Sequence, residues 1–85
     1  MKQFSYVLTS DHAMHGKPAA GLAKEAARFS SRIRLLGDMK AAELTDVHDV
    51  LMLDMRCGDS VTVWVDGSDE EDAVAALQNY FVANM

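Results

Sequence analysis

The chain has one cysteine and one proline in 85 residues, and no apolar run approaches the roughly 18 residues that suggest a membrane span. A lone cysteine, Cys57, cannot form an internal disulfide, which favours a reducing compartment. The N-terminal stretch also lacks the apolar core and cleavage site of a secretory signal. We therefore expect a cytoplasmic protein with no membrane contact.

Basic residues are missing from the last third of the sequence. Eight Lys/Arg and seven Asp/Glu precede Cys57, whereas residues 57–85 hold six acidic residues and no basic one. A chain of net charge −5 without a uniformly basic surface is a poor polyanion binder, so we expect no nucleic-acid partner. Several basic residues gather around and after His15, and they point to an anionic group or an acidic partner on that side, with a solvated helix face as the simpler alternative: Lys17, Lys24, Arg28, Arg32 and Arg34.

The apolar pattern predicts one domain, residues 1–85, with a single modest core. Alternation with period two predicts four strands, over residues 2–9, 31–36, 39–42 and 60–65. Three- and four-residue spacings predict three helices, over residues 16–30, over 46–54 and from Ser68 onward. The order β-α-β-β-α-β-α indicates an α+β fold, with a mostly antiparallel sheet covered on one face by helices.

The final helix opens on a run of acidic residues. Ser68 and Glu71 have the spacing of a capping box, and the acids from Asp69 to Asp72 suit the positive end of a helix. This structural explanation is sufficient, so we expect no metal site there. An apolar face is predicted to follow, made of Val74, Leu77, Phe81 and Val82.

His15 stands directly before a predicted helix start. The unpaired N–H groups at such a start favour anions, Gly16 adds no bulk beside them, Lys17 adds a cation, and Pro18 suits the first turn. The positive helix end also lowers the proton affinity of the ring, which leaves a neutral imidazole as a nucleophile. From spacing alone, an ordinary polar cap and a thin metal site with His12 remain alternatives.

The segment TSDHAMHGKPAAGLAKEAARFSSRI resembles the active-site region of the HPr family, the histidine-containing phosphocarriers of the bacterial sugar phosphotransferase system. The family pattern Gly-(Leu/Ile)-His-(Ala/Thr)-Arg-Pro-Ala-(Ala/Thr) is matched here by Ala13, Met14, His15, Gly16, Lys17, Pro18, Ala19 and Ala20. The resemblance extends over the whole chain. It implies an open-faced β-sandwich, in which a four-stranded antiparallel sheet carries three helices on one face.

The resemblance also implies a function. His15 would accept a phosphoryl group on Nδ1 from phosphoenolpyruvate-dependent enzyme I and pass it to sugar-specific acceptor subunits. The N–H of Gly16 and the cation of Lys17 would hold the phosphate. Such a protein is a carrier with a phosphohistidine intermediate rather than a stand-alone enzyme, it needs no cofactor, and we expect a monomer.

A second region of the family docks partners through the short helix, which here offers Val47, His48, Leu51 and Met52. In Gram-positive members a serine that opens this helix is phosphorylated by a dedicated kinase, and the product binds a transcriptional repressor. Asp46 occupies that position here. Either the chain lacks this control, or Asp46 mimics the permanently charged, phosphorylated state. An aspartate that stabilises the first turn is the simpler interpretation.

Three residues near His15 depart from the family pattern. Lys17 replaces arginine and keeps the charge without the planar fork, Gly16 replaces a residue with a Cβ, and Ala13 replaces glycine. Together with Asp46 they leave an alternative: an HPr-like regulatory or adaptor protein that binds partners without efficient phosphoryl transfer. Retention of His15 favours the carrier.

Overall fold

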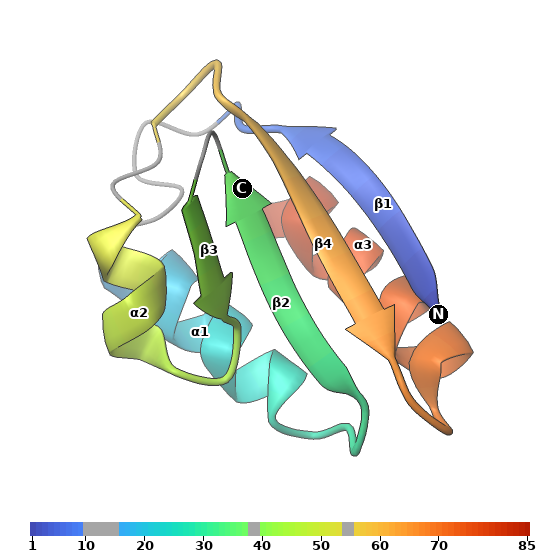
Figure 1. Cartoon of the computed structure of the whole chain (residues 1–85). Helices are drawn as coiled ribbons and strands as arrows, with labels where there is room; N and C mark the ends of the chain where they lie inside the picture. Colours follow the sequence, from blue (N-terminus) through green and yellow to red (C-terminus); the bar gives the residue numbers. More distant parts are fainter. Residues whose placement is uncertain (10–15, 38–39, 54–55) are drawn as a thin grey trace.

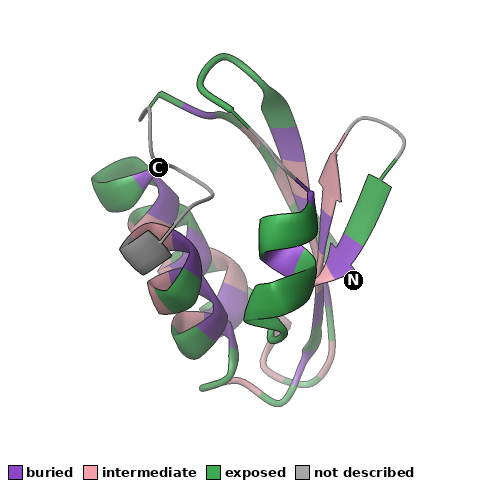
Figure 2. Cartoon of the chain, turned by 90° about the vertical axis from the view of Figure 1, so that its left-hand side faces the viewer, coloured by how far each residue is buried: buried purple, intermediate pink, exposed green. Residues whose placement is uncertain are grey.

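The computed structural model describes residues 1–9, 16–37, 40–53 and 56–85, with only the backbone of Gly16 and Lys17. Its elements follow the predicted order: β1 (Lys2–Val7), α1 (Gly16–Ala26), β2 (Arg32–Gly37), β3 (Lys40–Glu43), α2 (Val47–Met52), β4 (Ser60–Asp66) and α3 (Glu70–Asn84). The strands form one antiparallel sheet in the order β1-β4-β2-β3, and the helices lie on one of its faces (Figures 1 and 2). The predicted α+β open-faced sandwich is confirmed.

Strand β4 lies in the interior of the sheet and shows why the alternating pattern forms strands. Val61, Val63 and Val65 are at most 1% exposed and face the helices, whereas Trp64 lies on the open face. Val63 pairs with Phe4 of β1 on one side and with a leucine of β2 on the other. Every second residue therefore joins an apolar row beneath the helices, as a period of two requires.

Helices α1 and α3 cover this apolar face with residues three or four positions apart. The fully buried contacts are Ala19, Leu22 and Ala26 from α1, and Ala73, Leu77 and Phe81 from α3. The Phe81 ring packs on β1, with its centroid 5.7 Å from that of Phe4 and 5.4 Å from that of Tyr6. The prediction that Val82 shares this face is wrong. It lies about 100° around the helix from Phe81 and is 74% exposed.

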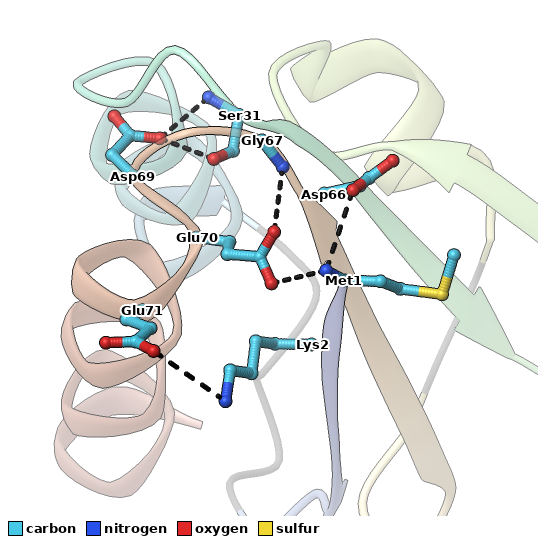
Figure 3. Close-up of polar contacts among 8 residues, drawn as sticks. All are labelled: Met1, Lys2, Ser31, Asp66, Gly67, Asp69, Glu70 and Glu71. Atoms are coloured by element: carbon cyan, nitrogen blue, oxygen red, sulfur yellow. Dashed lines mark hydrogen bonds and ion pairs between the residues drawn. The ribbon is translucent and has the colours of Figure 1, made fainter.

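The capping box predicted at Ser68 is also wrong. Helix α3 begins at Glu70, and the side chain of Asp69, in the flanking position, makes no capping bond. Its carboxylate instead accepts hydrogen bonds from the backbone N–H of Ser30 at 2.8 Å and of Ser31 at 2.9 Å, and from both hydroxyls (Figure 3 shows Ser31). The tertiary partner has therefore taken the oxygen atoms that a local cap would use.

Helix α1 is shorter than the sequence predicts, ending at Ala26 instead of Ser30. The N–H groups of Arg28 and Phe29 donate to carbonyls three residues back, at 3.2 Å each, which tightens the chain into a turn. Ser30 and Ser31 then turn their N–H groups to Asp69. In the ranges the structure describes, no helix is long and apolar enough to cross a bilayer.

Candidate functional site

Helix α1 begins at Gly16, the residue that follows His15 in the sequence. His15 itself lies outside the described residues, as do His12 and the side chain of Lys17. Pro18 is in the first turn of α1, as predicted, where its missing N–H leaves no hydrogen bond unmade. That turn contains no acidic residue, so nothing within α1 offsets the positive end of the helix. The structure thus supplies the helix start that the prediction for His15 requires.

The basic residues that follow His15 do not gather at this helix start. Arg32 and Arg34 alternate along β2 with residues buried beneath the helices, so they lie on the opposite, open face of the sheet. There Nη2 of Arg32 lies 2.9 Å and Nε of Arg34 3.7 Å from Oε1 of Glu43 on β3. Arg28 forms an ion pair with Glu25 at the far end of α1. Strand alternation keeps Arg32 and Arg34 away from the start of α1, and Arg28 lies beyond the far end of that helix. The expectation that these arginines gather at the helix start is therefore wrong.

A tyrosine that sequence reasoning missed contacts the first turn of α1. The hydroxyl of Tyr80, on α3, donates a hydrogen bond of 2.7 Å to the carbonyl oxygen of Pro18. The only signal in the sequence is Gly21, because glycine is unfavourable in the middle of a predicted helix unless something needs the space. Nothing local marks Tyr80 as its partner.

Helix α2 carries the residues predicted to dock partners, and it packs beside α1 (Figure 1). Val50 anchors the helix in the core, while Val47 is 38%, Leu51 39% and Met52 67% exposed. His48 is exposed on the same short helix. These exposed side chains therefore lie on the helix that packs beside α1, where the family resemblance predicts a docking surface.

Asp46 caps α2. Its Oδ1 accepts hydrogen bonds from the backbone N–H of His48 at 3.0 Å and of Asp49 at 3.3 Å, which is the geometry of an N-cap. The structure therefore gives this carboxylate a stabilising role, in line with the simpler of the two interpretations from sequence.

Asp69, Glu70 and Glu71, at the start of α3, have protein partners of their own (Figure 3). The N-terminal ammonium of Met1 donates to Glu70, and this bond lowers the pKa of the Glu70 carboxyl below its usual value. The Ser31 hydroxyl is the main cause of a lowered pKa at Asp69. Asp69 meets the chain just after the end of α1, about 16 Å along the helix from its start. This cluster is therefore not part of the candidate site.

The remaining candidate chemistry is sparse. The Sγ of Cys57 is exposed and lies 3.6 Å from the carbonyl oxygen of Thr9, near the end of β1. Within the described parts of the chain, no three His, Cys, Asp or Glu side chains are placed to hold a metal ion together. The features that remain for function are the start of α1, the exposed residues of α2 and the Tyr80 contact.

Comparison with known proteins gives these features a context. The sequence model of the family described as "PTS HPr component phosphorylation site" matches residues 2–83. The phosphocarrier protein HPr of Mycoplasma capricolum subsp. capricolum is 32% identical over 82 residues, which cover 96% of this chain and 92% of that protein.

Solved structures agree. The histidine-containing phosphocarrier protein of a mycoplasma superposes with a TM-score of 0.93 at 30% identity, covering 96% of this chain and 93% of that one. An HPr dimer from Thermoanaerobacter tengcongensis superposes with a TM-score of 0.78 at 28% identity, covering 98% and 95%.

Proposed function

Because this chain belongs to the HPr family, the phosphocarriers of the phosphotransferase system, we propose that it carries a phosphoryl group on His15. The donor is phosphoenolpyruvate-dependent enzyme I, and the acceptors are sugar-specific subunits of the same system. The observation that carries the proposal is the position of α1, which begins at the residue after His15 with no acid in its first turn. The proposal includes a cytoplasmic location, where the carrier would meet these partners.

The transfer needs few groups. The unprotonated Nδ1 of His15 uses its lone pair to form a bond to phosphorus, while the bond from phosphorus to the donor breaks and its electron pair leaves with the donor. The return step is the same displacement, with the acceptor as nucleophile. The N–H of Gly16 and the ammonium of Lys17 would stabilise the phosphoryl oxygens, because a helix start and a cation both favour negative charge. The partners supply the rest of the catalysis.

Docking is assigned to α2. Val47, Leu51 and Met52 would be covered by the partner, and His48 would sit among them as the polar member. These side chains lie on the helix that packs beside α1, so a partner seated on them would lie close to α1 as well.

Labelling tests the proposal directly, because the chain has only three histidines: His12, His15 and His48. The protein is incubated to completion with enzyme I, labelled phosphoenolpyruvate and Mg²⁺. We expect one acid-labile, base-stable phosphate per chain, lost in His15→Ala and kept at the end point in His12→Ala and His48→Ala. No label on the wild type, or label that survives His15→Ala, would overturn the assignment.

The alternative, an adaptor that binds partners without efficient transfer, rests on Lys17, Gly16 and Asp46. The initial rate of labelling in the same assay separates the adaptor from the carrier. As a reference, the same enzyme I is given an HPr from its own organism. An adaptor should be labelled far more slowly than this reference HPr. We expect a monomer, and sedimentation at the assay concentration distinguishes it from a dimer.

A further inference from the structure

Tyr80 and Pro18 connect the last turns of α3 to the first turn of α1. The Tyr80 ring packs against the core, and its hydroxyl donates to the Pro18 carbonyl at 2.7 Å. In a regular helix that carbonyl already accepts the N–H four residues ahead, and its second lone pair is open to another donor. Tyr80 supplies that donor from a helix 62 residues away in sequence.

Gly21 makes this contact possible. A Cβ at position 21 would lie 2.3 Å from the hydroxyl oxygen of Tyr80 and 3.2 Å from its Cζ, so any side chain there would displace the hydroxyl. Glycine is among the least favourable residues inside a helix, and here it occupies the interior of α1. Gly21 therefore makes α1 less stable at the point where the Tyr80 hydroxyl approaches it.

The carbonyl that accepts from Tyr80 belongs to the peptide group whose N–H end faces the helix start. The Pro18 carbonyl and the Ala19 N–H lie in one plane, and in a helix this N–H points back toward the N-terminus. Because Pro18 has no N–H, the N–H of Ala19 is the first one after that of Lys17 that can point toward the helix start. A donor on the carbonyl fixes the plane and polarises the N–H at its other end.

We propose that Tyr80 is a positioning residue for phosphoryl transfer, which holds the first turn of α1 through the Pro18 carbonyl in the space left by Gly21. This inference rests on the proposed function of His15. The hydroxyl remains a donor throughout the neutral range, because burial raises the pKa of Tyr80 above its ordinary value of 10.0, and Glu25 adds to the shift. Docking is not involved, since Tyr80 lies on α3 and the apolar residues assigned to docking lie on α2.

Tyr80→Phe tests the hydroxyl alone, with Tyr6→Phe as the matched control, since these are the only tyrosines in the chain. We expect Tyr80→Phe to lower kcat for transfer from enzyme I about two- to tenfold, the range of one uncharged hydrogen bond. The KM of the variant as a substrate of enzyme I should stay unchanged. Assays run well below the unfolding temperature of each variant, so lost stability alone cannot lower the rate.

A second readout needs no phosphoryl transfer. In ¹⁵N-labelled protein, the amide proton of Ala19 should shift upfield in Tyr80→Phe and stay in place in Tyr6→Phe. Gly21→Ala should reproduce both the shift and the lower kcat. In the Tyr80→Phe background the nearest atom is Cζ, so adding Gly21→Ala should lower kcat little further.

The outcomes separate the two proposals. A wild type that takes no label removes the function of His15 and leaves the Ala19 shift as a separate result. A labelled wild type whose kcat and Ala19 shift are unchanged in Tyr80→Phe overturns the positioning role alone. So does a loss of kcat that appears equally in Tyr6→Phe.

Discussion

The carboxylate of Asp69 accepts hydrogen bonds from both the backbone N–H and the hydroxyl of Ser31, 38 residues earlier in the chain. Ser30 adds a second pair to the same carboxylate, at 2.8 and 3.2 Å. Bonds to an ionised acceptor are the stronger kind, and they stabilise the charged form of the carboxyl. Together they fasten the chain after α1 to the start of α3, while Tyr80 fastens the other end of α1.

Asp69→Asn should therefore weaken the fold at neutral pH and flatten its dependence on acid. The pKa of Asp69 is lower in the folded chain than its ordinary value of 3.8. Such a group stabilises the fold above that value, and the contribution is lost as the pH falls through the folded pKa. Urea unfolding between pH 7 and the acid limit of folding measures this.

Asp72→Asn is the control, because Asp72 is an exposed acid in the first turn of the same helix. It should retain the acid dependence of the wild type. If Asp69→Asn loses stability with acid as steeply as the wild type does, the serine contacts do not hold the carboxyl in its charged form.

The capping role of Asp46 predicts how substitutions there behave. Asp46→Ala should lower the free energy of unfolding by about 1 kcal/mol, because two backbone N–H groups of α2 lose their acceptor. Asp46→Ser should cost much less, since a hydroxyl oxygen can accept the same bonds. Equilibrium urea unfolding of the two variants compares them.

The same pair addresses regulation. With a serine kinase of the family and ATP, Asp46→Ser should gain an acid-stable phosphate, whereas the wild type and Asp46→Ala should not. Acid-stable label on a wild-type residue near position 46 would contradict this. An Asp46→Ala variant as stable as the wild type would in turn remove the capping explanation.

The sheet was predictable because alternation records burial directly. Val61, Val63 and Val65 face the helices in the structure as the pattern required, and Trp64 faces away. The predicted cap at Ser68 and the predicted end of α1 at Ser30 are wrong for one reason. The carboxylate of Asp69 binds Ser30 and Ser31, which lie far from it in the sequence. Local patterns carry no information on such a choice.

The helix start beside the candidate site was predictable in a different way. His15 is a prediction from a motif and from an expected helix start, and the structure places that start at Gly16. The contact between Tyr80 and Pro18 was not predictable, because it depends on how two helices pack. Gly21 was the one residue whose local cost could have signalled it.

Docking through α2 predicts that Met52→Asp raises the KM of the carrier, as a substrate of enzyme I, about tenfold with little change in kcat, because a charge must be buried when the partner covers this side chain. Val82→Asp on α3 is the matched control, since Val82 is 74% exposed and Met52 67%. Steady-state transfer from a fixed amount of enzyme I to varied concentrations of each variant gives both constants. Equal effects of the two substitutions would show that partners do not distinguish α2 from the rest of the surface.

Lys17 offers the sharpest test of how the phosphate is held. An ammonium binds an oxyanion as a point charge, whereas the guanidinium of arginine presents two parallel N–H groups to it. If the phosphoryl group sits at the start of α1, Lys17→Arg should speed transfer about two- to tenfold, the scale of one added hydrogen bond. Lys17→Gln, which removes the charge, should slow transfer by a larger factor than Lys17→Arg speeds it.

The control is Lys24→Arg, an exposed substitution further along α1, which should leave the rate of transfer unchanged. Rapid-quench measurement of phosphohistidine formation supplies these rates. A Lys17→Arg variant no faster than the wild type would show that, beside Gly16, the site already fits the ammonium.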